Sequence, residues 1–143
     1  MYLQALPASA VPADQTGCDA LFDVEFDELR RRVLAGEAVW LTQGFFQLNE
    51  VYWPRTDHGD CELPVFSGRH IEDPGGGPGH TVLAPEEVAR AAAFLERVSF
   101  PALWGDRTDA DLRDRLAADH EELRAFYGRA AARGLSVLKH FSF

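Results

Sequence analysis

Two long stretches in the second half of the chain carry apolar side chains every three or four residues, which is the spacing of an amphipathic helix. The first stretch begins at Pro85, a residue type that fits the first turn of a helix, and its apolar stripe continues to Val98. The second begins near Asp109 and ends at Gly134, because glycine is favoured just after the last helical residue. The pattern therefore predicts two helices in this part of the chain.

Shorter apolar segments bounded by glycine, proline or charged residues predict the strands of a sheet. In the last of these segments Leu135, Val137 and Phe141 stand at even spacing, so they share one side of a strand. A further helix is expected over residues 22–35. The expected strands are residues 2–6, 63–66, 81–83 and 135–143, and the expected loops are residues 8–19, 55–62 and 68–79.

Residues 39–52 fit two kinds of secondary structure. Residues 39–41 form an apolar run typical of a buried strand, whereas apolar residues from Leu41 to Tyr52 recur at helical spacing. Gly44 weakens the helical pattern because glycine has a low helix propensity. We prefer the helix, ended by Pro54.

The order of these elements indicates a small mixed sheet covered by helices. A chain of 143 residues, of which 46% are hydrophobic and 26% charged, has the size and composition of one globular domain. We therefore expect a single α/β domain of the mixed α+β type over residues 1–143.

Three pieces of the sequence, in order, resemble one bacterial family. Met-Tyr-Leu at 1–3 is similar to its first strand. Gly-Gly-Gly-Pro-Gly at 75–79, followed by Val-Leu-Ala-Pro-Glu-Glu-Val at 82–88, is similar to its glycine-proline loop and the helix start after it. Residues 123–138 are similar to its closing helix and strand. This is the YfbM-like family, bacterial proteins catalogued as a domain of unknown function. The resemblance covers nearly the whole chain and implies a compact α/β domain without supplying an activity.

One segment departs from that family. Phe-Phe-Gln-Leu-Asn at 45–49 stands where the family typically has a Trp-His-Gly-Leu-His run on a helix. Aromatic bulk is kept and both imidazoles are lost. The departure favours a packing or binding role for this segment over proton transfer.

The charge of the chain excludes two classes of partner. The net charge is −9 and the isoelectric point is about 4.9, so the surface repels phosphate backbones and anionic lipids. Arg30, Arg31 and Arg32 are consecutive, so on a helix they point in different directions and form no groove-binding stripe. Because no apolar run approaches the roughly 18 residues of a membrane helix, we expect neither a nucleic acid nor a membrane as partner.

The cysteines and the N-terminal segment indicate a reducing compartment. Cys18 and Cys61 are the only cysteines, too few for a disulfide framework. Residues 1–7 contain no basic residue and no apolar core of a signal peptide. The predicted location is the cytoplasm.

Two loops contain residue types that bind metals or phosphates in other proteins. Residues 57–62 include Asp, His, Cys and Glu, but no second element supplies the spaced ligand pairs of a zinc site. The glycine run at 75–79 lacks the Lys-Ser/Thr of a P-loop and the spaced glycines of a dinucleotide fold. We therefore expect no metal and no cofactor, and interpret the loops as an acidic surface loop and a tight connector.

A candidate pocket or surface site nevertheless follows from a few side chains. A glycine loop leading into a helix can form a pocket rim, with Gly76 inside the loop and His80 at its end. His120 shares a helical face with Tyr127, and is either a general base with a shifted pKa or a core histidine bonded to a backbone carbonyl. Trp53 is the tryptophan that we expect to be partly exposed.

Three functions fit these observations. We favour a non-catalytic protein-binding module of the bacterial cytosol, because the chain is acidic and has no Gly-x-Ser-x-Gly nucleophile motif. Immunity-type proteins that neutralise basic nuclease toxins are one version of it. The alternative is a small-molecule-binding protein or small enzyme, using a cleft between the glycine loop and the last helix with His80 or His120 as polar anchor. The third is a homodimer or larger homo-oligomer with a structural role.

Overall fold

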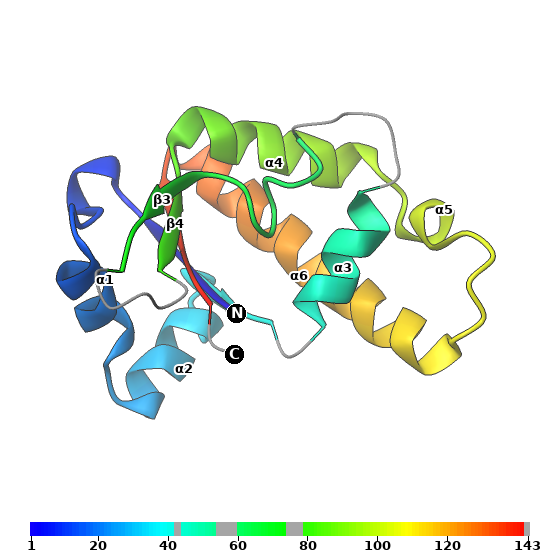
Figure 1. Cartoon of the computed structure of the whole chain (residues 1–143), viewed down its shortest axis with the longest axis horizontal. Helices are drawn as coiled ribbons and strands as arrows, with labels where there is room; N and C mark the ends of the chain where they lie inside the picture. The colour runs from blue at the N-terminus through cyan, green and yellow to red at the C-terminus, as the bar shows by residue number, and fades with distance from the viewer. Residues whose placement is uncertain (42–43, 54–59, 74–78, 142–143) are drawn as a thin grey trace.

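The structure of the chain is a computed structural model that describes residues 1–41, 44–53, 60–73 and 79–141. It consists of one five-stranded sheet with helices on both faces (Figure 1). This arrangement confirms the predicted α+β fold class. All the strand pairs that it describes are antiparallel.

The last strand of the chain occupies the middle of the sheet. The strand order is β2-β1-β5-β4-β3, so β5 lies between the first strand and β4. Strands β1 and β4 therefore both depend on β5 for backbone hydrogen bonds, and β5 joins the two halves of the sheet. The strands are β1 (Tyr2–Leu6), β2 (Ala38–Trp40), β3 (Arg69–Ile71), β4 (His80–Leu83) and β5 (Ser136–His140).

The helices form a thick layer on one face of the sheet and a thin layer on the other (Figure 1). The thick layer contains α3 (Phe45–Tyr52), α4 (Pro85–Arg97), α5 (Phe100–Trp104) and α6 (Ala110–Ala132). The thin layer contains α1 (Gln15–Phe22), α2 (Phe26–Leu34) and a short 3-10 helix, Ala8–Ala10. The large hydrophobic core lies under the thick layer, and a smaller apolar cluster lies under α1.

Side chains of β5 alternate between these two cores, as the pleat of a strand requires. Val137 and Phe141 belong to the large core, and Leu138 belongs to the small one. The predicted sharing of one side by Val137 and Phe141 is therefore confirmed. Fully burying one such apolar side chain contributes about 1.5–3 kcal/mol to stability.

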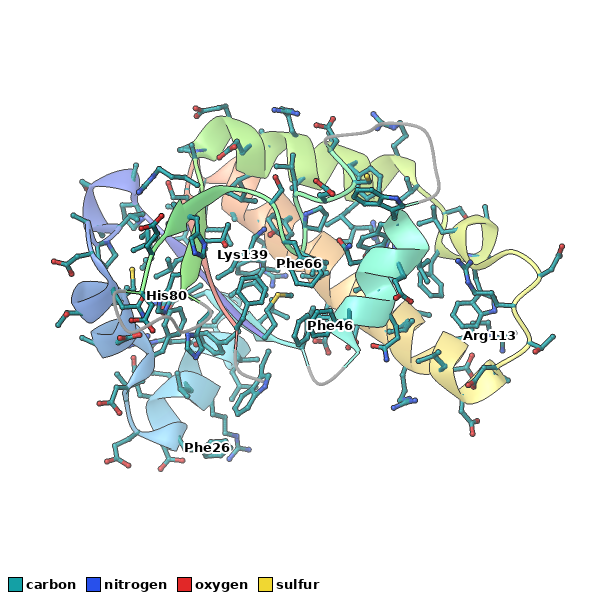
Figure 2. The ribbon with its side chains drawn as sticks, in the orientation of Figure 1. Phe26, Phe46, Phe66, His80, Arg113 and Lys139 are labelled. Carbon is teal, nitrogen blue, oxygen red and sulfur yellow. The ribbon has the colours of Figure 1, made fainter. Side chains whose placement is uncertain are left out.

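Lys139 is the only lysine of the chain, and it is completely buried on the thick side of β5 (Figure 2). Its ammonium donates to the carbonyl oxygens of Leu63 and Ser67, the latter at 2.8 Å. Close by, the buried Tyr127 hydroxyl donates to the carbonyl of Pro64 at 3.0 Å. These two side chains satisfy backbone acceptors of the 60–67 turn segment that a neighbouring strand would otherwise satisfy.

The predicted strand at 63–66 is wrong, because this segment forms consecutive turns. Its carbonyls bond to a lysine and a tyrosine side chain instead of to a ladder. The apolar Leu63 and Val65, which motivated the prediction, are buried in the large core.

Residues 39–52 contain both of the structures that the pattern allowed, one after the other. Strand β2 covers the apolar run at 38–40, and α3 covers the later part of the helical pattern, so the preferred helix from Leu41 was too long. Gly44 precedes α3 where a Cβ atom would lie 2.9 Å from Leu116 Cδ2. A side chain at position 44 would therefore force the Leu116 side chain to move.

The thin layer differs most from the predictions. The expected loop at 8–19 contains the 3-10 helix and the first part of α1, which begins where the Asp14 carboxylate accepts the backbone N–H of Gly17. The expected helix at 22–35 is shortened to α2, in which no residue is fully buried. Even the apolar Phe26 is 64% exposed. The expected loop at 68–79 contains the edge strand β3. Short helices with few core contacts leave weak periodicity in a sequence.

The strand at 81–83 and the helices from Pro85 and Asp109 are confirmed by β4, α4 and α6. The Asp109 carboxylate accepts the N–H of Leu112, and the N–H of Ala84 donates to Glu87 at 2.8 Å. Among the described residues no helix is both long enough and apolar enough to cross a membrane.

The environment of Lys139 predicts an unusual pH dependence of stability. Burial lowers the pKa of this amine from 10.5 to about 7, and the charge of Glu87 opposes the shift. Between these two pKa values the unfolded chain binds a proton that the folded chain does not, so stability rises with pH over this interval. The gain is at most about 1.4 kcal/mol per pH unit.

A Lys139→Met variant keeps the length of the side chain and loses the titration. We expect the difference in unfolding free energy between the native chain and this variant to grow in favour of the native chain between pH 7 and pH 10, by roughly 3–4 kcal/mol. Urea unfolding at several pH values measures it, and unpaired carbonyls in the variant add only a constant offset. Parallel curves would show that the amine stays protonated in the folded chain.

Candidate metal centre

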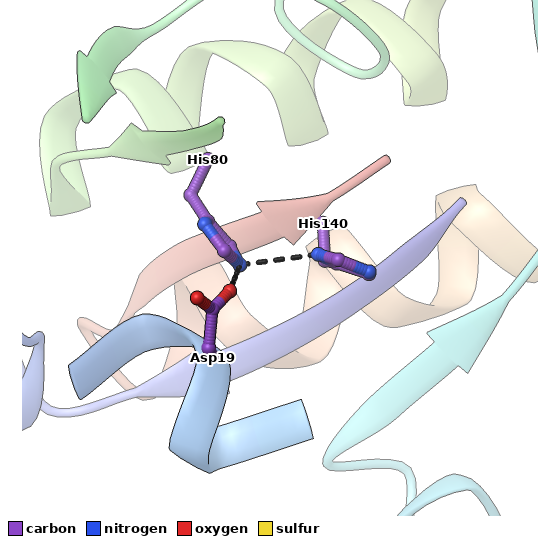
Figure 3. A group of neighbouring side chains, drawn as sticks. All are labelled: Asp19, His80 and His140. Carbon is purple, nitrogen blue, oxygen red and sulfur yellow. Dashed lines mark hydrogen bonds and ion pairs between the residues drawn. The ribbon is translucent and has the colours of Figure 1, made fainter. Parts of the chain in front are cut away.

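Two histidines stand side by side on the thin-layer face of the sheet. His80 begins β4, His140 ends β5, and the two residues are partners in the antiparallel register. Register partners project their side chains from the same face, with Cβ atoms about 5 Å apart. Strand pairing alone therefore brings the imidazoles together, and His80 Nε2 lies 3.1 Å from His140 Nδ1 (Figure 3).

Helix α1 carries a carboxylate to the same point. Cys18 is buried against the sheet and fixes the rotation of the helix. The next residue, Asp19, faces His80 with its Oδ1 atom 3.6 Å from His80 Nε2 (Figure 3). One nitrogen of each histidine and one oxygen of Asp19 thus lie within 4.8 Å of one another. We call Asp19, His80 and His140 the His-Asp cluster.

Gln15 lies one helical turn before Asp19 and holds two members of the cluster. Its amide nitrogen donates to Asp19 Oδ1 at 2.9 Å, and its Oε1 atom accepts from His80 Nδ1 at 3.0 Å. Because an amide oxygen only accepts, this contact places the proton of the neutral His80 ring on Nδ1. His80 Nε2 therefore carries a lone pair that points into the cluster.

The contact between Asp19 and His80 consequently joins two acceptors. His80 Nε2 accepts from the N–H of His140 Nδ1, and Asp19 Oδ1 accepts from Gln15. No proton is available to lie between Nε2 and the carboxylate, which agrees with their separation of 3.6 Å. A cation that displaced the His140 proton from Nε2 would be held by this nitrogen and by the carboxylate together.

Burial keeps the two imidazoles in the form that binds metals. It lowers the pKa of His80, and the charge of His140 lowers it further, whereas Asp19 opposes both effects. Burial also lowers the pKa of His140. Since the ordinary value is 6.5, both rings are mainly neutral at pH 7, as ligation requires.

Two of the three distances within the cluster are those of metal ligands. Donor atoms about 2.0–2.2 Å from a shared transition metal lie about 2.9–3.6 Å from one another in octahedral or tetrahedral geometry. The two separations at His80 Nε2, 3.1 Å and 3.6 Å, fall in this interval. His140 would carry its proton on Nε2 instead of Nδ1, which frees Nδ1 to bind the metal, and Gln15 would be the outer partner that orients His80.

Aromatic rings cover one side of the cluster. The Phe22 ring stacks on both imidazoles, with centroids 5.4 Å from His80 and 5.0 Å from His140. Tyr2 meets the edge of Phe22, and Trp40 follows Tyr2 along the sheet. The Phe22 ring thus covers a face of both imidazoles, while Asp19 lies at the solvent edge.

Two hollows open beside the cluster. The larger has a volume of ≈630 Å³ and is lined by Gln15 and Asp19, by three further acids (Asp14, Glu72 and Asp73) and by one cation, Arg69, beside His70. Its acidic wall attracts cations. The smaller hollow, of ≈180 Å³, lies beside the aromatic rings that cover the cluster and includes His140 in its wall.

Of the candidate residues taken from the sequence, His80 lies in this cluster. Gly76 falls outside the described residues. His120 and Tyr127 both lie on α6 in the large core, on the opposite face of the sheet. Trp53 follows α3 in the thick layer and is 52% exposed, which confirms its predicted partial exposure.

His120 is a core histidine, as one of the two interpretations predicted. It is buried, its Nδ1 atom lies 2.9 Å from the Tyr52 hydroxyl, and burial lowers the pKa of its ring. Its partner is a tyrosine side chain rather than the expected backbone carbonyl. Because His80 lies on the other face of the sheet, the two histidines do not line one cleft.

The acidic loop expected at 57–62 contributes no residue to the cluster. Residues 57–59 lie outside the described residues, Asp60 forms an ion pair with Arg90, and Cys61 is buried. Asp19, Gln15 and His140 are not among the candidate residues taken from the sequence. Strand alternation could have placed His140 on the face of β5 opposite to Lys139, and Asp14 could have marked the start of α1. The pairing of β5 with β4 carries no local signal.

Comparison of the chain with protein-family models, with curated proteins and with solved structures found no match. The resemblance to the YfbM-like family therefore stays a prediction that rests on the residues quoted for it. The cluster is interpreted from its own geometry.

Proposed function

We propose that this chain binds a divalent transition-metal ion through Asp19, His80 and His140. The observation that carries the proposal is the meeting of two lone-pair donors, His80 Nε2 and Asp19 Oδ1, at 3.6 Å, with the same glutamine fixing both.

The donor set suits zinc, cobalt, nickel or iron(II). Imidazole nitrogens favour these ions over magnesium and calcium, which prefer oxygen ligands. Two histidines and one carboxylate supply three ligands, and protein sites of this composition keep further coordination positions open for water or a small molecule. The acidic wall of the larger hollow provides an entry for the cation.

A bound ion would make this a small-molecule-binding site, the alternative considered from the sequence. The polar anchor would then be the metal held by His80, and His120 would have no part in it. The protein-binding module, the homo-oligomer and the cytoplasmic location stay predictions. For the first of these, Asp111 and Asp114 are exposed on the first turns of α6.

Cobalt(II) titration tests the proposal directly. We expect saturation at one ion per chain, with visible absorption bands of a nitrogen- and oxygen-ligated cobalt. Asp19 is exposed, so Asp19→Asn should fold normally, and the loss of an anionic ligand should weaken binding at least about 100-fold. At 100 times the dissociation constant, the ion should raise the Tm of the native chain by roughly 9 °C.

Glu72→Gln is the matched control, because it removes one negative charge from the wall of the same hollow without touching the ligands. Its dissociation constant should stay within about threefold of the native value. Equal weakening in both variants would mean that the ion is attracted only by the acidic surface. Absence of saturable cobalt binding by the native chain would overturn the proposal.

Gln15 should act as a positioning residue. Gln15→Leu keeps the size of the side chain and removes its bonds to Asp19 and His80, so cobalt affinity should fall about 10- to 100-fold. The absorption bands should remain, because all three ligands are present. Thr16→Ala, at an exposed neighbour that lines the same hollow, should change neither quantity. An unchanged affinity in Gln15→Leu would show that the ligands need no such support.

A further inference from the structure

Large apolar side chains face solvent on helix α2, Phe26–Leu34. Phe26 is 64% exposed and Leu34 is 78% exposed, and Figure 2 shows Phe26 at the edge of the molecule. Val33, at 36%, is exposed beside them. Three of the six exposed large hydrophobic side chains in the described part of the chain therefore belong to one helix of nine residues. Contiguous apolar patches of this kind mark interaction surfaces.

The spacing of these residues places them on one face of the helix. Phe26, Arg30 and Leu34 are four residues apart, so their side chains lie in one row along α2. One exposed residue flanks this row on each side. The helix docks on the rest of the chain through its other side, where Arg32 donates to two oxygens. We call the exposed surface the α2 face, and it consists of Phe26, Asp27, Arg30, Val33 and Leu34.

The α2 face also carries two charges that the chain itself does not pair. Within the described residues, Asp27 and Arg30 form no ion pair and no side-chain hydrogen bond, although helical neighbours three apart can reach each other. The charges beside them are paired, since Glu28 binds both Arg31 and Arg32. One free carboxylate and one free guanidinium are therefore left among the apolar side chains of this face.

This arrangement makes the α2 face complementary to itself. A two-fold axis near the middle of the helix sets a second α2 against the first in the opposite direction. Phe26 then lies against Leu34 of the second copy, and the long side chain of Arg30 reaches the carboxylate of Asp27 there. Apolar groups meet apolar groups, and each free charge meets an opposite one. A second copy therefore satisfies every member of this surface that the single chain leaves exposed.

From these observations we propose that two copies of this chain associate through their α2 faces in an antiparallel, two-fold dimer. The net charge of −9 on each chain does not prevent it. At physiological ionic strength, interactions between exposed charges fade beyond about 8 Å, so that the contacts at the interface decide. The inference is independent of the proposed metal, because no residue of the His-Asp cluster belongs to the α2 face. It assigns a surface to the homodimer expected from the sequence.

Sedimentation velocity of the native chain, with a chelator present, tests the dimer separately from the metal site. A helix of nine residues offers a small interface, so we expect a dissociation constant of roughly 1–100 μM. The sedimentation coefficient should rise from the monomer value to the dimer value across this range of concentration. A chain that stays monomeric at about 0.5 mM would overturn the inference and leave the α2 face to a different protein.

Leu34→Ser tests the apolar part of the contact. Leu34 packs little in the single chain, so the variant should fold normally, and it should weaken the dimer at least about tenfold. Trp53→Ser is the matched control, because Trp53 is also exposed but follows α3 in the thick layer. It should leave the dissociation constant within about threefold. A dimer that Leu34→Ser does not weaken uses another surface, which contradicts the inference.

Two charge variants used together test the pairing of Asp27 with Arg30. In a homodimer of Asp27→Arg, or of Arg30→Asp, like charges face each other at both contacts, so each variant should dimerise at least about tenfold more weakly than the native chain. In a mixture of the two variants, opposite charges face each other at both contacts. We therefore expect a heterodimer whose dissociation constant lies within about threefold of the native value. Native mass spectrometry identifies it, because the two variants differ in mass.

The mixture contains its own control for folding, since recovered association requires that both variants are folded. Arg115→Asp reverses an exposed charge on α6 and should leave the dimer within about threefold of the native affinity. If the mixed variants associate no better than either does alone, Arg30 does not face Asp27 of a second copy and the antiparallel dimer is wrong. Neither result bears on cobalt binding, so this inference and the proposed function fail separately.

Discussion

The side-chain alternation of β5 is the constraint on which both the large core and the His-Asp cluster depend. Lys139 and His140 are adjacent, and the pleat sends one into the large core and the other to the thin layer. Lys139 holds the 60–67 segment through two carbonyls, and His140 meets His80 across the ladder. A register shift of one residue would exchange the two side chains, so that a single slip would remove both features.

Polar side chains are buried on both faces of the sheet, but their hydrogen-bond partners differ. Lys139 and Tyr127 donate to backbone carbonyls inside the protein. In the His-Asp cluster, by contrast, the two histidines bond to each other, and no proton lies between Asp19 and His80. A cation could replace the proton that the two histidines share, whereas the bonds of Lys139 and Tyr127 to carbonyls offer no such exchange. This difference distinguishes the structural polar cluster from the candidate site.

Local signals were enough to predict the two long helices of the thick layer and three of the strands, but not the short helix α5. Helices α4 and α6 have long apolar stripes, a proline or aspartate at the start and, for α6, a glycine after the end, and β1, β4 and β5 are short apolar runs next to turn residues. The thin layer escaped prediction because its helices bury little. Cys18 is the fully buried residue of α1, and no residue of α2 is fully buried. Such helices are stabilised by contacts with the sheet, and these contacts leave no regular spacing of apolar residues in the sequence.

The candidate site could be predicted only in part for a related reason. His80 was named because it follows a glycine-rich run, which is a local feature. Its partners lie 61 residues before it and 60 residues after it along the chain, and they meet it through a strand register and a helix docking that are properties of the whole fold. The two histidines that drew attention together, His80 and His120, are separated by the sheet.

The same organisation explains why a metal would matter to this fold beyond its chemistry. The sheet contributes both histidines, whereas the carboxylate and its supporting glutamine come from α1, which has a single fully buried residue. A metal bound by all three ligands would therefore tie the thin layer to the central strands. Ligand binding and docking of α1 would be one equilibrium, because an undocked helix removes the anionic ligand and the positioning residue together. The local stability of the thin layer would then determine how readily the site opens. The large core on the other face of the sheet would not have to open for the ion to bind.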